Sequence, residues 1–317
     1  LCAASCFAMT ASRSTVPYYT LDTPRSVTLT YNGDRAFPRP FVYADVSVAS
    51  APAAIQNYIL EVKRNGANLP FTNGETKLTF AGTSSPAAPY RLAGQIDMSS
   101  YQTGVDSVTI LVTAIYTNGQ SDVTPVKAQL MIVNTHSSPI ANGWGIAGLQ
   151  RLYYAPEGGT GGQGYMIENG DGSATYFTSG NTTGPDLSKL SLNGQVWTRT
   201  YVDSSRVLFD ASGRMTTAID RLGRQTQFQY GGSDGFHLLS IMEPMRTSGS
   251  SPAAPYLSLA YDGNGRLASV TETGSTGNRT TGVSVDGNGY LTRVTDPDGG
   301  YDSYGYDTSG RLHTITD

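Results

Sequence analysis

The sequence has few charged side chains and lacks the patterns of a nucleic-acid-binding, membrane-spanning or helical protein. Charged residues make up 15% of the 317 residues and the net charge is −4. No basic cluster occurs, so we expect no nucleic-acid partner. No apolar run reaches the length of a transmembrane helix, and we predict no transmembrane span. Lysine is scarce and long amphipathic helical patterns are missing, which disfavours a helical fold.

Residue patterns typical of enzymes are also missing. The three histidines, His136, His237 and His313, do not have the spacing of metal ligands, and no Gly-x-Ser-x-Gly motif occurs. A Gly-x-Gly-x-x-Gly spacing is present at 159–164, but the residues after it predict a hairpin, whereas a phosphate site requires a helix there. We therefore expect no catalytic activity and no bound cofactor.

Cysteine occurs only at Cys2 and Cys6. Three interpretations stay open: a short-loop disulfide in an oxidising extracellular setting, two free thiols, or a lipid anchor at Cys6. The chain starts on Leu1 and stops inside a repeat, so we expect a piece of a longer polypeptide. We expect it to be secreted or held at the cell surface. Glycosylation at Asn181 or Asn278 is left open.

Glycine and tyrosine, by contrast, are abundant, with 37 and 20 residues. Asn-Gly dipeptides recur along the whole chain, and they favour tight type I′ hairpins because both residues tolerate positive φ. They begin at Asn32, Asn65, Asn73, Asn118, Asn142, Asn169, Asn193, Asn264 and Asn288. Alternating apolar and polar runs lie between them, so the sequence predicts an all-β fold built from antiparallel hairpins.

We expect the first half of the chain to form an immunoglobulin-like β-sandwich over 24–135, after an extended segment at 1–23. Seven alternating runs with short, regular turns support this interpretation. They are 26–31, 41–48, 57–64, 76–80, 89–97, 107–116 and 125–133. The run at 107–116 is apolar on both faces, which predicts a central strand.

A Gly- and Pro-containing stretch marks a junction, which we place at 136–205. Its apolar residues Trp144, Ile146, Leu149 and Leu152 are expected to plug the base of the second domain. Two hairpins follow, centred on Asn169-Gly170 and Asn193-Gly194.

The segment 206–317 consists of a repeated hairpin. Its units read VLFDASGRM, LAYDGNGRL, VSVDGNGYL and YGYDTSGRL, with a weaker copy at 228–241. Each aspartate can accept hydrogen bonds from its own turn, and each following glycine can adopt the left-handed conformation that closes it. These structural turn residues are Asp210, Gly213, Asp262, Gly265, Asp286, Gly289, Asp307 and Gly310. One hairpin cannot bury its apolar face alone, so the units are expected to stack into one open sheet.

The pattern Tyr-Asp-x-x-Gly-Arg-Leu resembles the YD repeat of the Rhs family of secreted bacterial proteins, which is related to toxin-complex proteins and teneurins. The junction at 137–154 and the opening stretch at 14–33 also resemble segments that this family carries before its repeats. The resemblance implies a β-sheet that spirals into a hollow shell, often around a C-terminal toxin. This chain has about five units, too few to close such a shell.

The aspartate-rich turns offer the oxygen ligands that calcium prefers. No acidic residue follows the DGNG turns at the position of a bidentate calcium ligand, so we interpret them as hydrogen-bonded turns. Asp296, Asp298 and Asp302 in DPDGGYD are the remaining candidates for a calcium ion.

The sequence therefore predicts a non-catalytic, secreted structural or interaction protein. We expect it to form homo-oligomers through β-sheet edges, as an extracellular fibre or shell, because the closing run at 305–317 has no Lys or Pro to protect an edge. One alternative is a wall segment of a toxin-enclosing shell whose cargo lies beyond residue 317. The other is a carbohydrate-binding surface module, an interpretation based on the tyrosine content alone.

Overall fold

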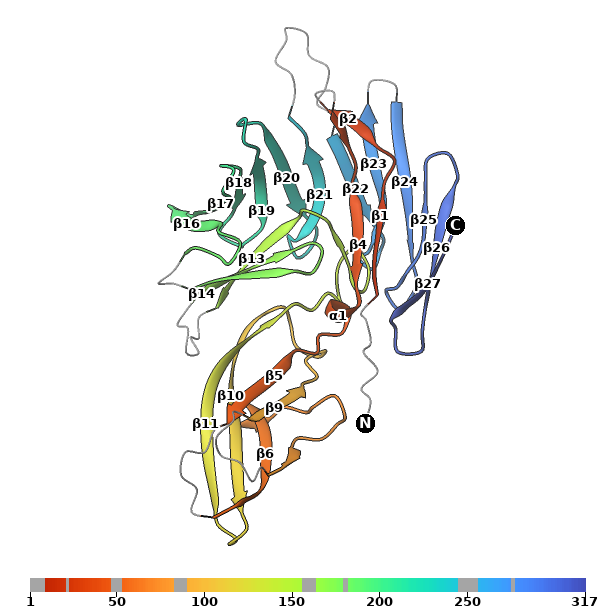
Figure 1. Cartoon of the computed structure of the whole chain (residues 1–317). Helices are drawn as coiled ribbons and strands as arrows, with labels where there is room; N and C mark the ends of the chain where they lie inside the picture. Colours follow the sequence, from red (N-terminus) through yellow and green to blue (C-terminus); the bar gives the residue numbers. More distant parts are fainter. Residues whose placement is uncertain are drawn as a thin grey trace.

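The computed structural model describes residues 9–20, 23–46, 53–82, 90–155, 164–178, 182–244, 256–274 and 277–317. Strands dominate these residues, with one short helix, α1 (Gly33–Ala36), among them. The prediction of an all-β fold is confirmed. Figure 1 shows a β-sandwich at one end of the molecule and a long antiparallel sheet at the other.

The sandwich consists of two sheets that share one core. Its strands are β5 (Phe41–Val46), β6 (Ile55–Arg64), β7 (Ala67–Asn68), β8 (Leu78–Ala81), β9 (Tyr90–Gln95), β10 (Gly104–Tyr116) and β11 (Ser121–Ile132). One sheet has the order β11-β10-β6-β7, with β8 also paired to β6, and the other pairs β5 with β9. Strand β10 is central, as its apolar faces predict, because it pairs with both β11 and β6.

The strand predicted at 26–31 does not belong to this sandwich. It forms β4 (Thr28–Asn32), which pairs with β1 (Thr10–Ser14) on one side and β12 (Trp144–Ile146) on the other. Its buried side chains, Leu29 and Tyr31, pack in the core of the long sheet. Alternation identified this strand correctly, but alternation alone does not identify the sheet that covers its apolar face. Nearby, β2 (Tyr18–Thr20) pairs with β3 (Thr23–Arg25).

The long sheet contains twelve strands in sequence order, β16 to β27. They are β16 (Lys189–Asn193), β17 (Val196–Thr200), β18 (Arg206–Phe209), β19 (Met215–Ile219), β20 (Gln225–Gly231), β21 (His237–Met242), β22 (Tyr256–Tyr261), β23 (Leu267–Gly274), β24 (Gly277–Val285), β25 (Leu291–Thr295), β26 (Tyr301–Tyr306) and β27 (Leu312–Thr316). The sheet thus starts before residue 206, because the hairpin predicted around Asn193 pairs directly with β18.

Two smaller sheets cover one face of the long sheet. The sheet β1-β4-β12 packs against strands β21 to β27, with Trp144 fully buried between them. The other has the order β13 (Gln150–Ala155), β14 (Gly164–Asn169) and β15 (Ala174–Thr178), and it packs against β16, β18 and β19 through Leu152, Ile167 and Phe177. The apolar junction residues therefore pack against the long sheet, and Figure 1 shows β4 and β13 lying over it.

Most Asn-Gly dipeptides do not form the type I′ turns that we predicted. Both residues have positive φ at Asn65-Gly66, with values of 50° and 83°. At Asn118, Asn264 and Asn288 the asparagine keeps a negative φ, and the glycine N–H bonds to the carbonyl three residues before it. These turns are longer than two residues, because the glycine closes a type I turn followed by a bulge.

Candidate functional site

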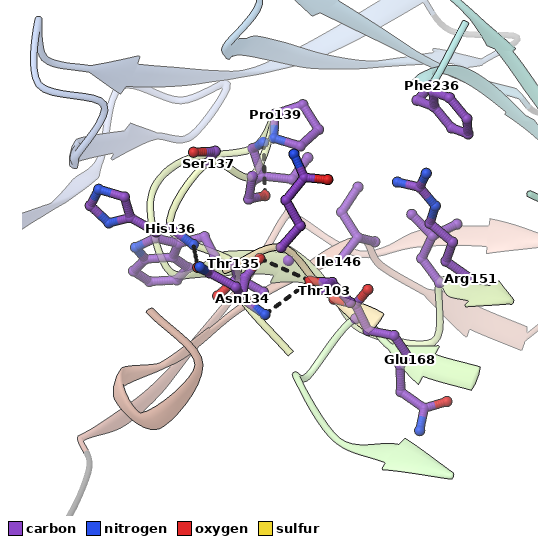
Figure 2. A pocket seen from close by; sticks show the side chains of 18 of the residues that line it. Thr103, Asn134, Thr135, His136, Ser137, Pro139, Ile146, Arg151, Glu168 and Phe236 are labelled. Carbon is purple, nitrogen blue, oxygen red and sulfur yellow. Dashed lines mark hydrogen bonds between the residues drawn. The ribbon is translucent and has the colours of Figure 1, made fainter. Parts of the chain in front are cut away.

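A cleft of about 570 Å³ opens where the sandwich, β13 and the long sheet meet. Its walls come from the loop 99–103, the linker 134–140, strand β13 and residues of the long sheet that include Tyr230, Phe236 and Tyr261. Figure 2 shows the linker side chains on one side of the cleft and Arg151 and Phe236 on the other.

The linker wall is held in place by Asn134. Its Nδ2 donates to the carbonyl oxygens of Ser99 at 2.9 Å and Tyr101 at 2.6 Å. Its Oδ1 accepts from the backbone N–H of His136 at 3.0 Å, and its own N–H donates to Thr103 Oγ1 at 2.9 Å. One asparagine thus joins the end of β11 to the loop before β10, so this wall is well fixed.

Arg151 on β13 forms the opposite wall. Its guanidinium lies 4.1 Å from the ring centre of Phe236 and 4.9 Å from that of Tyr153, and Figure 2 shows the side chain directed toward Phe236. Glu168 is its direct neighbour across the β13–β14 pair. Within the described part of the chain, however, Arg151 makes no ion pair, and its buried Nε has no hydrogen-bond partner.

Glu168 is hydrogen-bonded to Tyr153, another residue of the cleft. Its Oε2 accepts a hydrogen bond of 2.7 Å from Tyr153 Oη. Burial raises the pKa of Glu168, although the Tyr153 hydrogen bond and the charge of Arg151 oppose this effect. Burial also raises the pKa of Tyr153, so the phenol stays protonated and donates.

A second arginine near Phe236 is, by contrast, fully paired. Arg214 bonds Asp210 Oδ2 through Nε at 2.7 Å and donates to the carbonyl of Gly235 at 2.6 Å. The turn aspartate therefore neutralises the arginine that follows it. Arg224 and Asp220 form the same pair at 2.5 Å. The second pair lies in a turn, Asp220 to Gly223, that the sequence analysis did not identify although it has the same Asp-x-x-Gly-Arg pattern.

The eight predicted turn residues all lie in hairpin turns of the long sheet. In each turn the aspartate Oδ1 accepts from the backbone N–H groups two and four residues later, at 2.8 to 3.0 Å. The glycines have φ between 74° and 87°. The structure does not bring the eight together into one site, because the four turns join different strand pairs, β18–β19, β22–β23, β24–β25 and β26–β27, in a row at one end of the long sheet.

Replacing Asp262 by alanine is expected to lower the free energy of unfolding by about 1–2 kcal/mol, because two backbone N–H groups lose their acceptor. The matched control is Asp262→Asn, which keeps an Oδ1 acceptor and is expected to lose less than half as much. Urea unfolding followed by circular dichroism measures both. Equal stability of the alanine variant and the native protein would contradict this role.

The calcium candidates are separated by an arginine. Arg13 on β1 reaches Asp296 Oδ2 and Asp302 Oδ2, each at 2.6 Å, and Asp298 Oδ1 accepts from the Gly300 N–H at 3.2 Å. A guanidinium thus occupies the position between two of the three carboxylates. No cluster of three or more His, Cys, Asp or Glu suited to a metal ion occurs in the described ranges.

A buried arginine that sequence reasoning missed connects β17 to the turn before β16 and to β15. Arg199 is almost fully buried and bonds Asp186 Oδ2 at 2.8 Å, Ser188 Oγ at 3.0 Å and Thr175 Oγ1 at 3.2 Å. Like Arg214 and Arg224, it has a structural role. Its position in an alternating strand gave no signal, because a buried arginine is uncommon.

Several predicted features lie outside the described residues. These include Cys2, Cys6, Asn181 and most of the glycine-rich segment at 159–164. Asn278 is exposed on β24. His237 bonds Asp234 and the carbonyl of Gly265, at 2.9 and 3.0 Å, and thereby joins two turns. Among the described residues, no helix has the length and apolar character needed to cross a membrane.

Comparison with known proteins gives one type of match. No family model matches the sequence, and no curated protein matches it. Among solved structures, the chain is similar to one described as "Crystal Structure of TcdB2-TccC3-TEV", with 11% identity and a TM-score of 0.22. The match covers 96% of this chain and 19% of the other, so this chain spans about a fifth of that protein's length. That TM-score is too low to indicate a shared fold.

Proposed function

We propose that this chain is a non-catalytic, secreted structural protein of the YD-repeat type, whose twelve-stranded sheet is extended by strand addition at β27. For the 317-residue chain the added strand would come from a second copy, so that copies assemble into an extracellular fibre or shell. Two observations support this proposal. The hairpin repeat is regular, and its apolar face continues as far as the last strand, β27.

One side chain carries this proposal. The strands that return from successive turns share an apolar residue three positions after a buried leucine: Ile241, Val270, Val294 and Ile315. The first three are 6%, 3% and 1% exposed, whereas Ile315 is 43% exposed. Leu312, which starts the same strand, is buried at 4%. Ile315 is therefore an apolar side chain at a position that is buried in the other repeats but exposed here.

The difference in exposure comes from the number of neighbouring strands. Val294 lies on β25, which has β24 on one side and β26 on the other, whereas β27 pairs with β26 alone among the described residues. Ile315 is opposite the buried Tyr304, so it lies on the face that packs against the core. A strand edge with free N–H and C=O groups and an exposed apolar side chain favours pairing with another chain.

The two edges of the sheet differ. At the other edge, β16 begins with Lys189, which makes an isolated backbone bridge to Thr183. Lysine on an edge strand opposes strand addition, and the bridge occupies part of its backbone. Strand β27 has neither lysine nor proline. The β27 edge is therefore the one that we expect to accept a strand, and pairing of β27 with a different segment of the second copy gives a directional, open assembly.

We expect the 317-residue chain to associate in a concentration-dependent way, and Ile315→Lys to weaken this association at least about tenfold. Lysine places a charge where the added strand would pack. Val202→Lys is the matched control: Val202 is 74% exposed in a turn away from β27, and its replacement is expected to leave association unchanged. Multi-angle light scattering and negative-stain electron microscopy measure the outcome. A monodisperse monomer at high micromolar concentration, with no filaments, would contradict the proposal.

A further inference from the structure

We infer that the cleft between the linker and Arg151 binds a carboxylate carried on a sugar ring, that is, a hexuronic acid residue of an acidic glycan. This inference is independent of the proposed assembly at β27. It rests on an unpaired guanidinium, aromatic walls and unpartnered polar atoms that line one hollow.

The unpaired guanidinium is the feature that selects a carboxylate. Arg151 and Arg214 both lie near Phe236, at 4.1 and 5.8 Å from its ring centre. Arg214 is neutralised by Asp210, whereas Arg151 has no carboxylate within ion-pair distance among the described residues. A guanidinium presents paired N–H donors that match the two oxygens of a carboxylate. An acidic ligand would therefore complete at Arg151 the pair that Arg214 already has.

Glu168 does not replace such a ligand. Although it is opposite Arg151 in the strand register, its Oε2 is engaged by Tyr153 at 2.7 Å. Burial favours its neutral form, which reduces its repulsion of an incoming anion. Asp210 is the other acid near this wall, and both of its oxygens are used by its own turn and by Arg214.

The aromatic residues of the cleft favour a ligand with a sugar ring. Tyr230, Phe236 and Tyr261 line the long-sheet side of the cleft, next to Arg151. Tyr261 is fixed by a hydrogen bond of 2.9 Å from its hydroxyl to the carbonyl of Leu238. The apolar face of a pyranose packs on such rings, while its carboxylate reaches the guanidinium. A volume of about 570 Å³ lies within the usual range for small-ligand sites and is large enough for a short saccharide.

The linker side supplies groups for hydroxyls. Thr135 lines the cleft, and its buried Oγ1 has no hydrogen-bond partner, like Arg151 Nε on the opposite wall. Buried polar atoms without partners are uncommon in folded proteins, and a ligand is one way to satisfy them. A sugar carries hydroxyls around its ring, whereas a simple aromatic acid does not. The polar wall therefore favours a uronic acid over an aromatic carboxylate.

Isothermal titration calorimetry with glucuronate, galacturonate, glucose and benzoate tests this inference on the 317-residue chain. We expect binding of at least one uronate, with glucose and benzoate at least about tenfold weaker. Arg151→Met, which keeps an unbranched side chain on Phe236, is expected to lower uronate affinity at least about tenfold. Arg151→Lys keeps the charge and is expected to lose less. Arg224→Met, in a repeat turn away from the cleft, is the control and is expected to bind as the native protein does.

Three results would overturn the inference: no uronate binding at millimolar concentration, uronate binding that Arg151→Met leaves unchanged, or benzoate bound as tightly as the uronates. Circular dichroism melting of each variant shows whether it is folded. If Arg151→Met does not fold, Thr135→Val replaces it, with a loss of about threefold or more expected for the uronate. An unchanged affinity in that variant would count against the site.

Discussion

Replacing Trp144 by alanine is expected to lower the free energy of unfolding by about 3–5 kcal/mol, the usual range for a buried tryptophan. Trp144 is fully buried where β12 meets the long sheet. Its ring centre lies 5.5 Å from that of Tyr31 and 5.2 Å from that of Tyr304, and its Nε1 donates to Tyr306 Oη at 2.9 Å. The substitution leaves a large cavity and a buried hydroxyl without its donor.

The expected loss is a large fraction of the stability of a typical protein, so the variant would be unfolded or partly unfolded at moderate urea concentration. Trp144→Phe is the control, because it keeps most of the packing and removes the Nε1 donor. It is expected to cost about 1–3 kcal/mol. Urea unfolding followed by far-ultraviolet circular dichroism measures both variants. A loss below about 1 kcal/mol for the alanine variant would mean that the packing of Trp144 against the long sheet does not stabilise the fold.

The importance of Trp144 also shows what the sequence could predict. Composition and apolar spacing at 137–154 identified Trp144 and Ile146 as buried anchors, because large apolar residues between glycines have few alternatives to burial. Their partner strand was not predictable in the same way. Leu29 and Tyr31 alternate as in any half-buried strand, and only their contacts across more than a hundred residues assign β4 to this core.

The repeat turns were predictable because their chemistry is local. An aspartate followed by a glycine three residues later contains both the acceptor and the left-handed residue of one turn, so no distant contact is needed. The same rule extends to Asp220 and Gly223, where the signal was present but Thr217 and Gln225 replace the apolar residues that the other units have at these two positions. The arginine after the glycine had no assigned role, and the structure pairs it with its own aspartate in two turns.

The cleft could not be predicted. Asn134, Arg151 and Phe236 are far apart in the sequence and belong to a linker, a short sheet and a turn region of the long sheet. None has a neighbouring residue that marks a binding motif. Arg151 lies in an alternating strand, where a charged residue normally indicates the solvent-exposed face. The register places Glu168 opposite Arg151, but Glu168 Oε2 accepts a hydrogen bond from Tyr153, and no sequence pattern indicates that Arg151 lacks an ion pair.

Replacing a repeat-turn glycine by alanine is expected to lower the free energy of unfolding. Two nearly identical turns separate the cost of positive φ from the cost of a steric clash. Gly213 and Gly223 both follow an Asp-x-x pattern and have φ of 77° and 82°. A Cβ at Gly223 would meet no atom within 4 Å, whereas a Cβ at Gly213 would collide with the carbonyl oxygen of Leu152. Gly223→Ala therefore measures the cost of positive φ alone, about 1–2 kcal/mol.

Gly213→Ala is expected to cost about 3 kcal/mol or more, because the collision adds to the same backbone strain. The neighbouring backbone cannot move freely, since the Leu152 N–H donates to the Gly213 carbonyl at 2.8 Å and β13 is held there against the turn. Relief of the clash therefore requires β13 to separate from the long sheet. Amide hydrogen exchange is expected to show faster exchange across β13 in Gly213→Ala and no change there in Gly223→Ala. Equal losses of stability in the two variants, with β13 still protected in both, would show that the contact between this turn and β13 does not constrain the glycine.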